Sequence, residues 1–186
     1  MFAYCLNNPI DGYDPNGFAR NNTDDYNDNN IPDYLEERWV EFTNRSRAIL
    51  NGGECRDVTD EVNTALNNAI SELSEMSFVE KWFAFYEMVK DRGPWDIKRP
   101  ESWEKTIGTE HPGTIGTVVI YEGHYYTPEI LGNYTYGVLG KACGFDLSIL
   151  LLGSMYAAKN PAPGTYQYNN EMQDRLFIVN GFHRER

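Results

Sequence analysis

Apolar positions recur with helical spacing along most of the chain from residue 57 onward. In DVTDEVNTALNNAISELSEM they fall every three or four residues, which predicts a helix capped by Asp57 or Thr59. Its buried face should consist of Val58, Val62, Leu66, Ala69 or Ile70, and Leu73. A second helix is predicted in FVEKWFAFYEMVKDRG, which Gly93-Pro94 should end. We expect its stripe to be core: Phe78, Trp82, Phe85 or Tyr86, and Val89.

A short β-hairpin and a glycine-rich helix are expected next. After a loop containing WDIKRPESWEK, the segment TIGTVVIYEGHYYTP predicts two strands that turn at Glu122-Gly123. Thr127-Pro128-Glu129 has the residues of a helix start: a hydroxyl cap, a proline in the first turn and an acid near the positive end of the dipole. Each glycine in GNYTYGVLGKACG costs about 1 kcal/mol relative to alanine. Close backbone packing or a ligand should therefore compensate.

Two more helices complete the predicted fold. Asp146 should cap LSILLLGSMYAAK, and after the loop NPAPGTY, Asn170 should cap NEMQDRLFIVNG, which Gly181 ends. The predicted fold class is α+β, mostly α-helical with one β-hairpin, and the N-terminal segment is calcium-loop-like.

Composition adds limits to this picture. With 186 residues, of which 41% are hydrophobic, the chain can bury one domain core and carry extensions. No apolar run reaches the length of a transmembrane segment, and no secretion signal is visible. Cys5, Cys55 and Cys143 are too few and too widely spaced to predict a disulfide framework or a zinc site, so their redox state stays open.

The net charge of −12 is concentrated in the first part of the chain. Residues 1–78 hold 15 Asp and Glu against 5 Arg, whereas residues 79–186 hold 13 against 11 Lys and Arg. Neither part has the basic stripe that a nucleic-acid binder would show. Nucleic acid is therefore the less favoured partner.

The acidic segment NNTDDYNDNNIPDYLEE follows the spacing of a calcium-binding loop. Its oxygen ligands would come from Asp25, Asn27, Asn29, the Ile31 carbonyl, Asp33 (through water) and Glu36. Asn30 replaces the usual glycine, which lowers affinity without forbidding the loop, because asparagine tolerates the left-handed conformation. The segment resembles the calcium repeats of secreted bacterial proteins and thrombospondin type 3 modules. The alternative is a solvated acidic linker.

The first residues, YCLNNPIDGYDPNGF, resemble the end of the RHS (YD-repeat) core, after which a variable toxin is appended. The resemblance implies that residues 1–18 end such a core, that residues 19–56 are an acidic linker with the calcium loop, and that residues 57–186 are the toxin domain. Some RHS shells release the toxin at this motif by self-cleavage. That role would carry over to Pro9, Asp14, Pro15 and Gly17, although Asp14-Pro15 is also an ordinary turn.

Three acids stand out in the second half of the chain. Glu171 and Asp174 are three positions apart, which places both on one helix face near its predicted start, and Glu129 begins another helix. Two such helix starts could converge on a divalent cation and a phosphate. The alternative is that these acids merely cap their helices.

From Asp57 onward the chain resembles the polymorphic toxin type 44 (bacterial toxin 44) domain. The matching blocks are DVT, FYEMVKDRGPWDIK, EILGNYTYGVLGKACG and EMQDRLFIVNG. Glu129 and Glu171 stand where aspartate is usual, and the longer side chain moves each carboxylate by about 1 Å. The resemblance implies a catalytic set of Glu129, Glu171, Asp174, Asp96 and Asn133. Ca²⁺ or Mg²⁺ would be held by Glu129, Glu171 and Asp174.

The type 44 family is labelled a predicted RNase, but its acid pattern also resembles an LXG-type toxin that hydrolyses lipid II. The leading hypothesis is therefore an RHS-delivered antibacterial hydrolase of a phosphoester or pyrophosphate, acting on a polyprenyl-pyrophosphate wall precursor at the outer face of the cytoplasmic membrane. Its partners would be an immunity protein and the RHS shell or secretion apparatus. One alternative is a metal-independent RNase in the target cytoplasm, with catalytic His111, His124 or His183 and phosphate-binding Lys90, Lys98 or Arg175. Another is a non-enzymatic, calcium-stiffened RHS tip.

Overall fold

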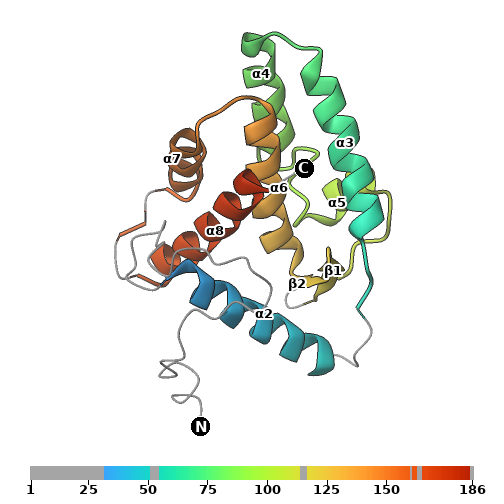
Figure 1. The fold of residues 1–186 in the computed structure, drawn as a ribbon, viewed down its shortest axis with the longest axis vertical. Helices are drawn as coiled ribbons and strands as arrows, with labels where there is room; N and C mark the ends of the chain where they lie inside the picture. Colours follow the sequence, from blue (N-terminus) through green and yellow to red (C-terminus); the bar gives the residue numbers. More distant parts are fainter. Residues whose placement is uncertain (1–31, 51–54, 114–116, 160, 163–164, 185–186) are drawn as a thin grey trace.

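The computed structural model describes residues 32–50, 55–113, 117–159, 161–162 and 165–184. Within these ranges the chain forms seven helices and one two-stranded sheet, which confirms the predicted α+β, mostly helical fold with one hairpin (Figure 1). In chain order the elements are α2 (Asp33–Leu50), α3 (Thr59–Ser74), α4 (Phe78–Val89), α5 (Pro100–Ile107), β1 (Val119–Tyr121), β2 (His124–Tyr126), α6 (Pro128–Ala142), α7 (Leu147–Ala157) and α8 (Tyr166–His183). No helix of these described ranges is long and apolar enough to cross a membrane.

Helix α3 forms as its spacing predicts. Its buried residues are Val62, Leu66, Ala69 and Leu73, which pack into the main core. The carboxylate of Asp57 accepts hydrogen bonds from the backbone N–H of Thr59 at 3.0 Å and from its hydroxyl at 2.6 Å. Asp57 therefore pairs a donor that the first turn leaves free, but Val58 occupies the N-cap position without a side-chain cap hydrogen bond, so the predicted cap at Asp57 or Thr59 is wrong.

Helix α4 begins where the sequence predicts, but most of its apolar stripe is not core. Ser77 and Glu80 form a capping box at its start. Of the alternatives Phe85 and Tyr86, Phe85 is the buried one, whereas Phe78 and Trp82 are exposed, so the expectation of a core stripe is wrong for these two. Periodicity marks an apolar face but does not determine whether another element covers it.

Helix α5 was not predicted, because WDIKRPESWEK was expected to be a loop. Pro100 occupies its first turn and Gly108, with φ 78°, ends it in the left-handed conformation. Both are standard helix-boundary residues, but eight residues are too few to show clear helical periodicity. The buried Trp103 anchors α5 in the main core.

The hairpin turns at Glu122 and Gly123, as predicted. Both residues have positive φ, 52° and 82°, which matches the turn to the twist of the two strands. Strands β1 and β2 pair antiparallel, with Ile120 opposite Tyr125. The backbone of Ile120 also exchanges hydrogen bonds with the segment before α3. Its N–H donates to the Arg56 carbonyl and its carbonyl accepts from the N–H of Val58, both at 2.9 Å.

Helices α6 and α8 cross through two glycines, and this confirms the expected close backbone packing of the glycine-rich helix. A Cβ atom on Gly137 would lie 2.1 Å from the carbonyl oxygen of Ile178. A Cβ atom on Gly181 would lie 1.9 Å from the carbonyl oxygen of Tyr134. Any larger residue at either position would force the helices apart, so the two backbones are held in direct contact.

Helix α8 begins at Tyr166 and ends at His183, so the prediction that Asn170 caps it and Gly181 stops it is wrong. Thr165, a residue type favoured at N-caps, precedes Tyr166, but the segment before Asn170 has no helical apolar period, which hid the earlier start. Glu171 and Asp174 consequently lie beyond the first turn, which holds no acid. Capping of the helix dipole therefore does not account for them. Asp146 precedes α7 as predicted, but its side chain makes no cap hydrogen bond.

Helix α2 lies within the segment that was expected to be a linker, and it packs against the rest of the domain. Val40 forms a second core cluster together with Ile130, Leu176 and Phe177. The Asn44 amide donates to the carbonyl oxygen of Tyr125 at 2.9 Å. The division at residue 56 stays a prediction.

The predicted calcium loop and RHS-like end fall largely on residues 1–31, outside the described residues. Asp25, Asn27, Asn29 and Ile31 belong to this part of the chain. Of the predicted calcium ligands, Asp33 and Glu36 are described: they lie in the first turn of α2, and Asp33 is buried. Calcium binding here stays a prediction.

Candidate functional site

A cavity of about 690 Å³ lies between α4, α6, α7, α8 and the segment that connects α4 to α5. All five predicted catalytic residues line it: Asp96, Glu129, Asn133, Glu171 and Asp174. Glu129 and Asn133 come from α6, and Glu171 and Asp174 come from α8. The glycine crossing of α6 and α8 thus brings together residues about forty positions apart.

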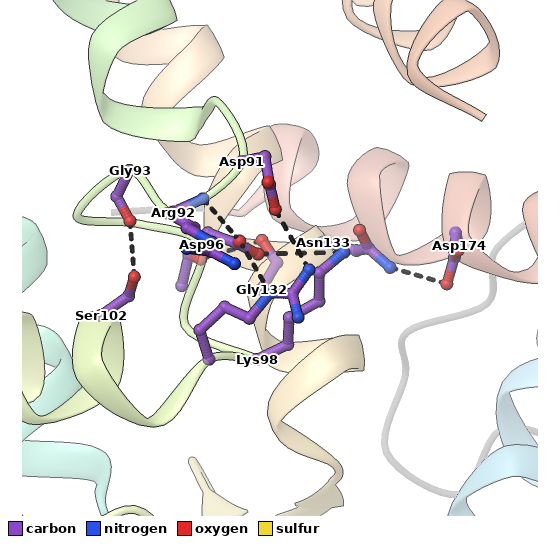
Figure 2. Close-up of polar contacts among 11 residues, drawn as sticks. Asp91, Arg92, Gly93, Asp96, Lys98, Ser102, Gly132, Asn133 and Asp174 are labelled. Atoms are coloured by element: carbon purple, nitrogen blue, oxygen red, sulfur yellow. Dashed lines mark hydrogen bonds and ion pairs between the residues drawn. The ribbon is translucent and has the colours of Figure 1, made fainter. Parts of the chain in front are cut away.

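Asp174 and Asn133 form the central contact of the site. The Asn133 Nδ2 donates to Asp174 Oδ1 at 2.7 Å, and Figure 2 shows the two side chains facing each other. Burial raises the pKa of Asp174 to about 7, and the negative charges of Glu129 and Glu171 add to this rise. The charge of Lys98 and the hydrogen bond from Asn133 oppose it. Asp174 can therefore both bind and release a proton near neutral pH.

Glu171 is the most buried acid of the cavity. Its side chain is 7% exposed, and its Oε1 has no hydrogen-bond partner among the described residues. Burial raises its pKa, while Ser154, Arg175 and Lys98 lower it. A buried carboxylate oxygen without a partner costs folding free energy. An unsatisfied acid of this kind is typical of a functional site.

Lys98 supplies positive charge to the cavity, and Asp96 holds the segment that carries it. The Asp96 carboxylate accepts from the backbone N–H of Arg92 at 2.9 Å and from Arg99 Nε at 3.4 Å. Lys98 Nζ lies 3.8 Å from Asp96 Oδ1 (Figure 2). Because the bonds of Asp96 are to its own segment, we interpret it as a positioning residue for Lys98.

The apolar part of the cavity was not predicted as a binding wall. Most of its large side chains come from α4 and α7 and from the turn before α7: Trp82, Phe85, Tyr86, Val89, Phe145, Ile149, Leu150 and Tyr156. Trp95 and Ile97 of the α4–α5 segment and Ile178 of α8 complete it. Tyr136 of α6 also lines it and donates to the Leu150 carbonyl at 3.2 Å. The signal in the sequence was the excess of aromatic residues in FVEKWFAFYEMV, which exceeds what one buried stripe needs.

The three histidines of the alternative RNase hypothesis do not line this cavity. The His111 ring packs against Trp103 with ring centroids 5.6 Å apart, and burial lowers its pKa. His124 is exposed on β2, and His183 stacks against its neighbour at the end of α8. Of the predicted phosphate-binding residues, Lys90 and Lys98 line the cavity and Arg175 does not.

The acids suit a hard cation in kind, since Ca²⁺ and Mg²⁺ prefer carboxylate and amide oxygens. Their arrangement is less suitable: no three Asp, Glu, His or Cys side chains of the described ranges lie close enough together to hold a metal ion. Glu129, Glu171 and Asp174 thus share a cavity without converging on one point. The divalent cation stays a prediction, and no step proposed below depends on it.

Comparison with known proteins identifies the class of molecule to which this cavity belongs. The sequence model for bacterial toxin 44 matches residues 84–183, from within α4 to the end of α8. The match identifies the protein as a bacterial toxin. It spans 100 of 186 residues, and the chain belongs to the bacterial toxin 44 family. No curated protein and no solved structure matches the chain.

Membership of this family confirms the toxin prediction; the match covers three of the four sequence blocks, while the DVT block at Asp57 lies outside it. A toxin domain of this kind implies a cognate immunity protein and delivery into target bacteria. The matched segment includes every residue of the cavity's acid cluster.

Proposed function

We propose that this toxin hydrolyses a phosphoester or pyrophosphate bond in a lipid-linked wall precursor such as lipid II. One observation carries the proposal: the buried Glu171 and the partly buried Asp174 lie in a cavity with polar groups at one side and large aromatic and aliphatic walls elsewhere. A polyprenyl pyrophosphate has the same two parts, a charged head and a hydrocarbon tail. The cavity volume falls within the range of small-molecule sites.

Asp174 would act as the proton-transfer group of the reaction. Its ionised form takes a proton from the water molecule whose oxygen bonds to phosphorus. As the bond between phosphorus and the bridging oxygen breaks, the protonated form gives that proton to the leaving oxygen. A pKa of about 7 allows both states at neutral pH.

The neighbours of Asp174 would prepare it for this role. Asn133 fixes the orientation of the carboxyl group through the 2.7 Å hydrogen bond. The charges of Glu171 and Glu129 raise its pKa, and the ammonium group of Lys98 attracts the phosphate, which the acids would otherwise repel. Protonation of Asp174 further reduces that repulsion.

The apolar walls favour a lipid over RNA. An RNA strand would place phosphates and riboses along the cavity, where side chains such as Trp82, Phe85 and Leu150 offer no hydrogen bonds. A hydrocarbon chain against the same side chains is stabilised by the burial of apolar surface. A substrate at the outer face of the cytoplasmic membrane is consistent with this chemistry.

The test measures cleavage of lipid II into a prenyl phosphate and a sugar phosphate, phosphate release from a short-chain prenyl pyrophosphate, and cleavage of total RNA. We expect hydrolysis of both lipids and no cleavage of RNA. Asp174→Ala should lower the rate at least about 100-fold, the usual scale for loss of acid–base help. Asp146→Ala is the matched control, because this exposed acid makes no cap hydrogen bond. Parallel reactions with EDTA, Ca²⁺ and Mg²⁺ test the predicted cation.

RNA cleavage that survives Asp174→Ala, without hydrolysis of either lipid, would refute the proposal. The RNase hypothesis would then be preferred. Toxicity in cells gives a second readout, because a wall-precursor hydrolase should kill when exported beyond the cytoplasmic membrane and an RNase when kept in the cytoplasm.

A further inference from the structure

Helices α4 and α7 leave an unusually large amount of apolar surface uncovered. Helix α7 has no charged residue, and only Leu150 on it is buried. The docking patch, as we call this surface, consists of the exposed apolar side chains of the two helices: Phe78, Val79, Trp82, Phe83, Tyr86, Ile149, Leu152 and Tyr156. A helix that is apolar all round is normally buried, so something else should cover α7.

The docking patch continues into the cavity. Four of its members, Trp82, Tyr86, Ile149 and Tyr156, are both exposed and part of the cavity lining. A ligand that enters past them passes from the patch to the acids without leaving apolar surface. Figure 1 shows α7 beside the α6–α8 pair, at the periphery of the fold.

We infer that the docking patch binds the surface of a lipid bilayer and turns the mouth of the cavity toward it. This inference rests on the proposed function, since the bilayer carries the lipid-linked substrate. Tryptophan and tyrosine, which the patch supplies at the cavity mouth, are the residues enriched at membrane–water interfaces. A lipid tail could then enter the cavity from the bilayer without crossing water.

The charges around the patch favour a lipid over a charged protein partner. On α4 the Glu80 carboxylate is engaged in the capping box with Ser77, and Glu87 is paired with Lys90. Contact with a bilayer therefore leaves these acids with their partners. A basic protein partner should bind where acidic residues are most frequent. Residues 1–78 carry most of the excess negative charge of the chain, whereas most of the docking patch lies after them.

The experiment measures sedimentation of the full chain with zwitterionic phosphatidylcholine vesicles, on which surface charge plays little part. The double variant Phe83→Ser, Leu152→Ser changes two side chains that are each 70% exposed and do not line the cavity. We expect its partition coefficient to fall at least tenfold. The matched control is Ile49→Ser, Leu50→Ser, at exposed apolar positions of α2, and it should bind vesicles like the wild type.

Two outcomes would overturn the inference: no sedimentation of the wild type, or an equal loss in both double variants. A dimer that light scattering detects in the wild type and not in the Phe83, Leu152 variant would also overturn it, because a second copy would then cover the patch. Each single variant should show an intermediate loss of vesicle binding. The single variants replace the double variant in the test if the double variant does not fold.

Rates of substrate hydrolysis separate this inference from the proposed function. We expect the Phe83, Leu152 variant to hydrolyse a short-chain, water-soluble prenyl pyrophosphate at the wild-type rate, and vesicle-embedded lipid II at least tenfold more slowly. Equal rates on vesicles would refute bilayer docking and leave the proposed function intact. If no substrate is hydrolysed but vesicle binding still depends on Phe83 and Leu152, the proposed function fails and the docking stands.

Discussion

Replacing Asp174 with asparagine should stabilise the protein while it removes the activity. The change keeps the size of the side chain, and the amide oxygen still accepts the hydrogen bond from Asn133. It removes a carboxylate whose pKa is raised from 3.8 to about 7. When a catalytic group that destabilises the fold is replaced, stability rises and activity is lost.

The size of the effect follows from the pKa shift. Between pH 3.8 and 7 the carboxyl is ionised in the unfolded chain but protonated in the folded one, so stability is lost as the pH rises through this window. A shift of about three units corresponds to about 4 kcal/mol. Partial exposure and interaction with Glu171 reduce this, so we expect Asp174→Asn to raise the free energy of unfolding by about 2 to 4 kcal/mol above pH 8.

Urea denaturation from pH 5.5 to 8.5 measures this difference and avoids the pI of about 4.6. The gain from Asp174→Asn should already be about half of its final size at pH 5.5, grow up to about pH 7 and stay constant above about pH 8. In a chain of this size a gain of 3 kcal/mol raises Tm by roughly 6 to 12 °C. Asp146→Asn, at an exposed acid, should show no such pH dependence. A variant that is equally or less stable at pH 8 would show that Asp174 is not a buried carboxyl with a raised pKa.

Three further predictions test the cavity and its scaffold. Glu171→Gln removes a negative charge, so the pKa of Asp174 should fall and the pH–rate profile should move to lower pH. Glu171→Asp should preserve activity. An unmoved pH–rate profile in Glu171→Gln would show that the charge of Glu171 does not affect Asp174. Gly181→Ala should lower the free energy of unfolding by about 3 kcal/mol or more by chemical denaturation, because its Cβ would clash with backbone. Gly132→Ala, at ordinary contact distance, should not. Asn44→Ala should lower the free energy of unfolding by about 1 to 2 kcal/mol if α2 belongs to the folded toxin. If α2 is a detachable linker, thermal melts of the variant and the wild type should be the same.

The sequence predicts those parts of the fold that local signals determine. The face of α3 follows from its apolar spacing, and the hairpin turn follows from Glu122-Gly123. Helix α5 was missed because eight residues show no clear period, even though proline and glycine mark its ends. The exposure of Phe78 and Trp82 was missed for a different reason: whether an apolar face is covered depends on the path of distant segments.

The candidate site was predictable in its residues but not in its geometry. Spacing places Glu171 and Asp174 on one helix face, and resemblance adds Asn133. The bond between Asn133 and Asp174 depends on the crossing of α6 and α8, which single-sequence patterns do not reveal. The apolar walls depend on α4 and α7 standing beside that crossing. The acidic residues of the candidate site were therefore visible in the sequence, whereas the apolar shape of the cavity was not.

The glycine crossing of α6 and α8 fixes the positions of the acids independently of the apolar walls that select the ligand. Gly137 and Gly181 hold the two acid-bearing helices by contact of one backbone with the other, which leaves no space for adjustment. Helix α7 meets this pair through side chains, as where Leu150 rests on Gly140. Its outer residues can therefore be exchanged without moving the acids. A protein engineer could use the α6–α8 pair as a fixed reactive base and redesign α4 and α7 to admit other amphiphiles.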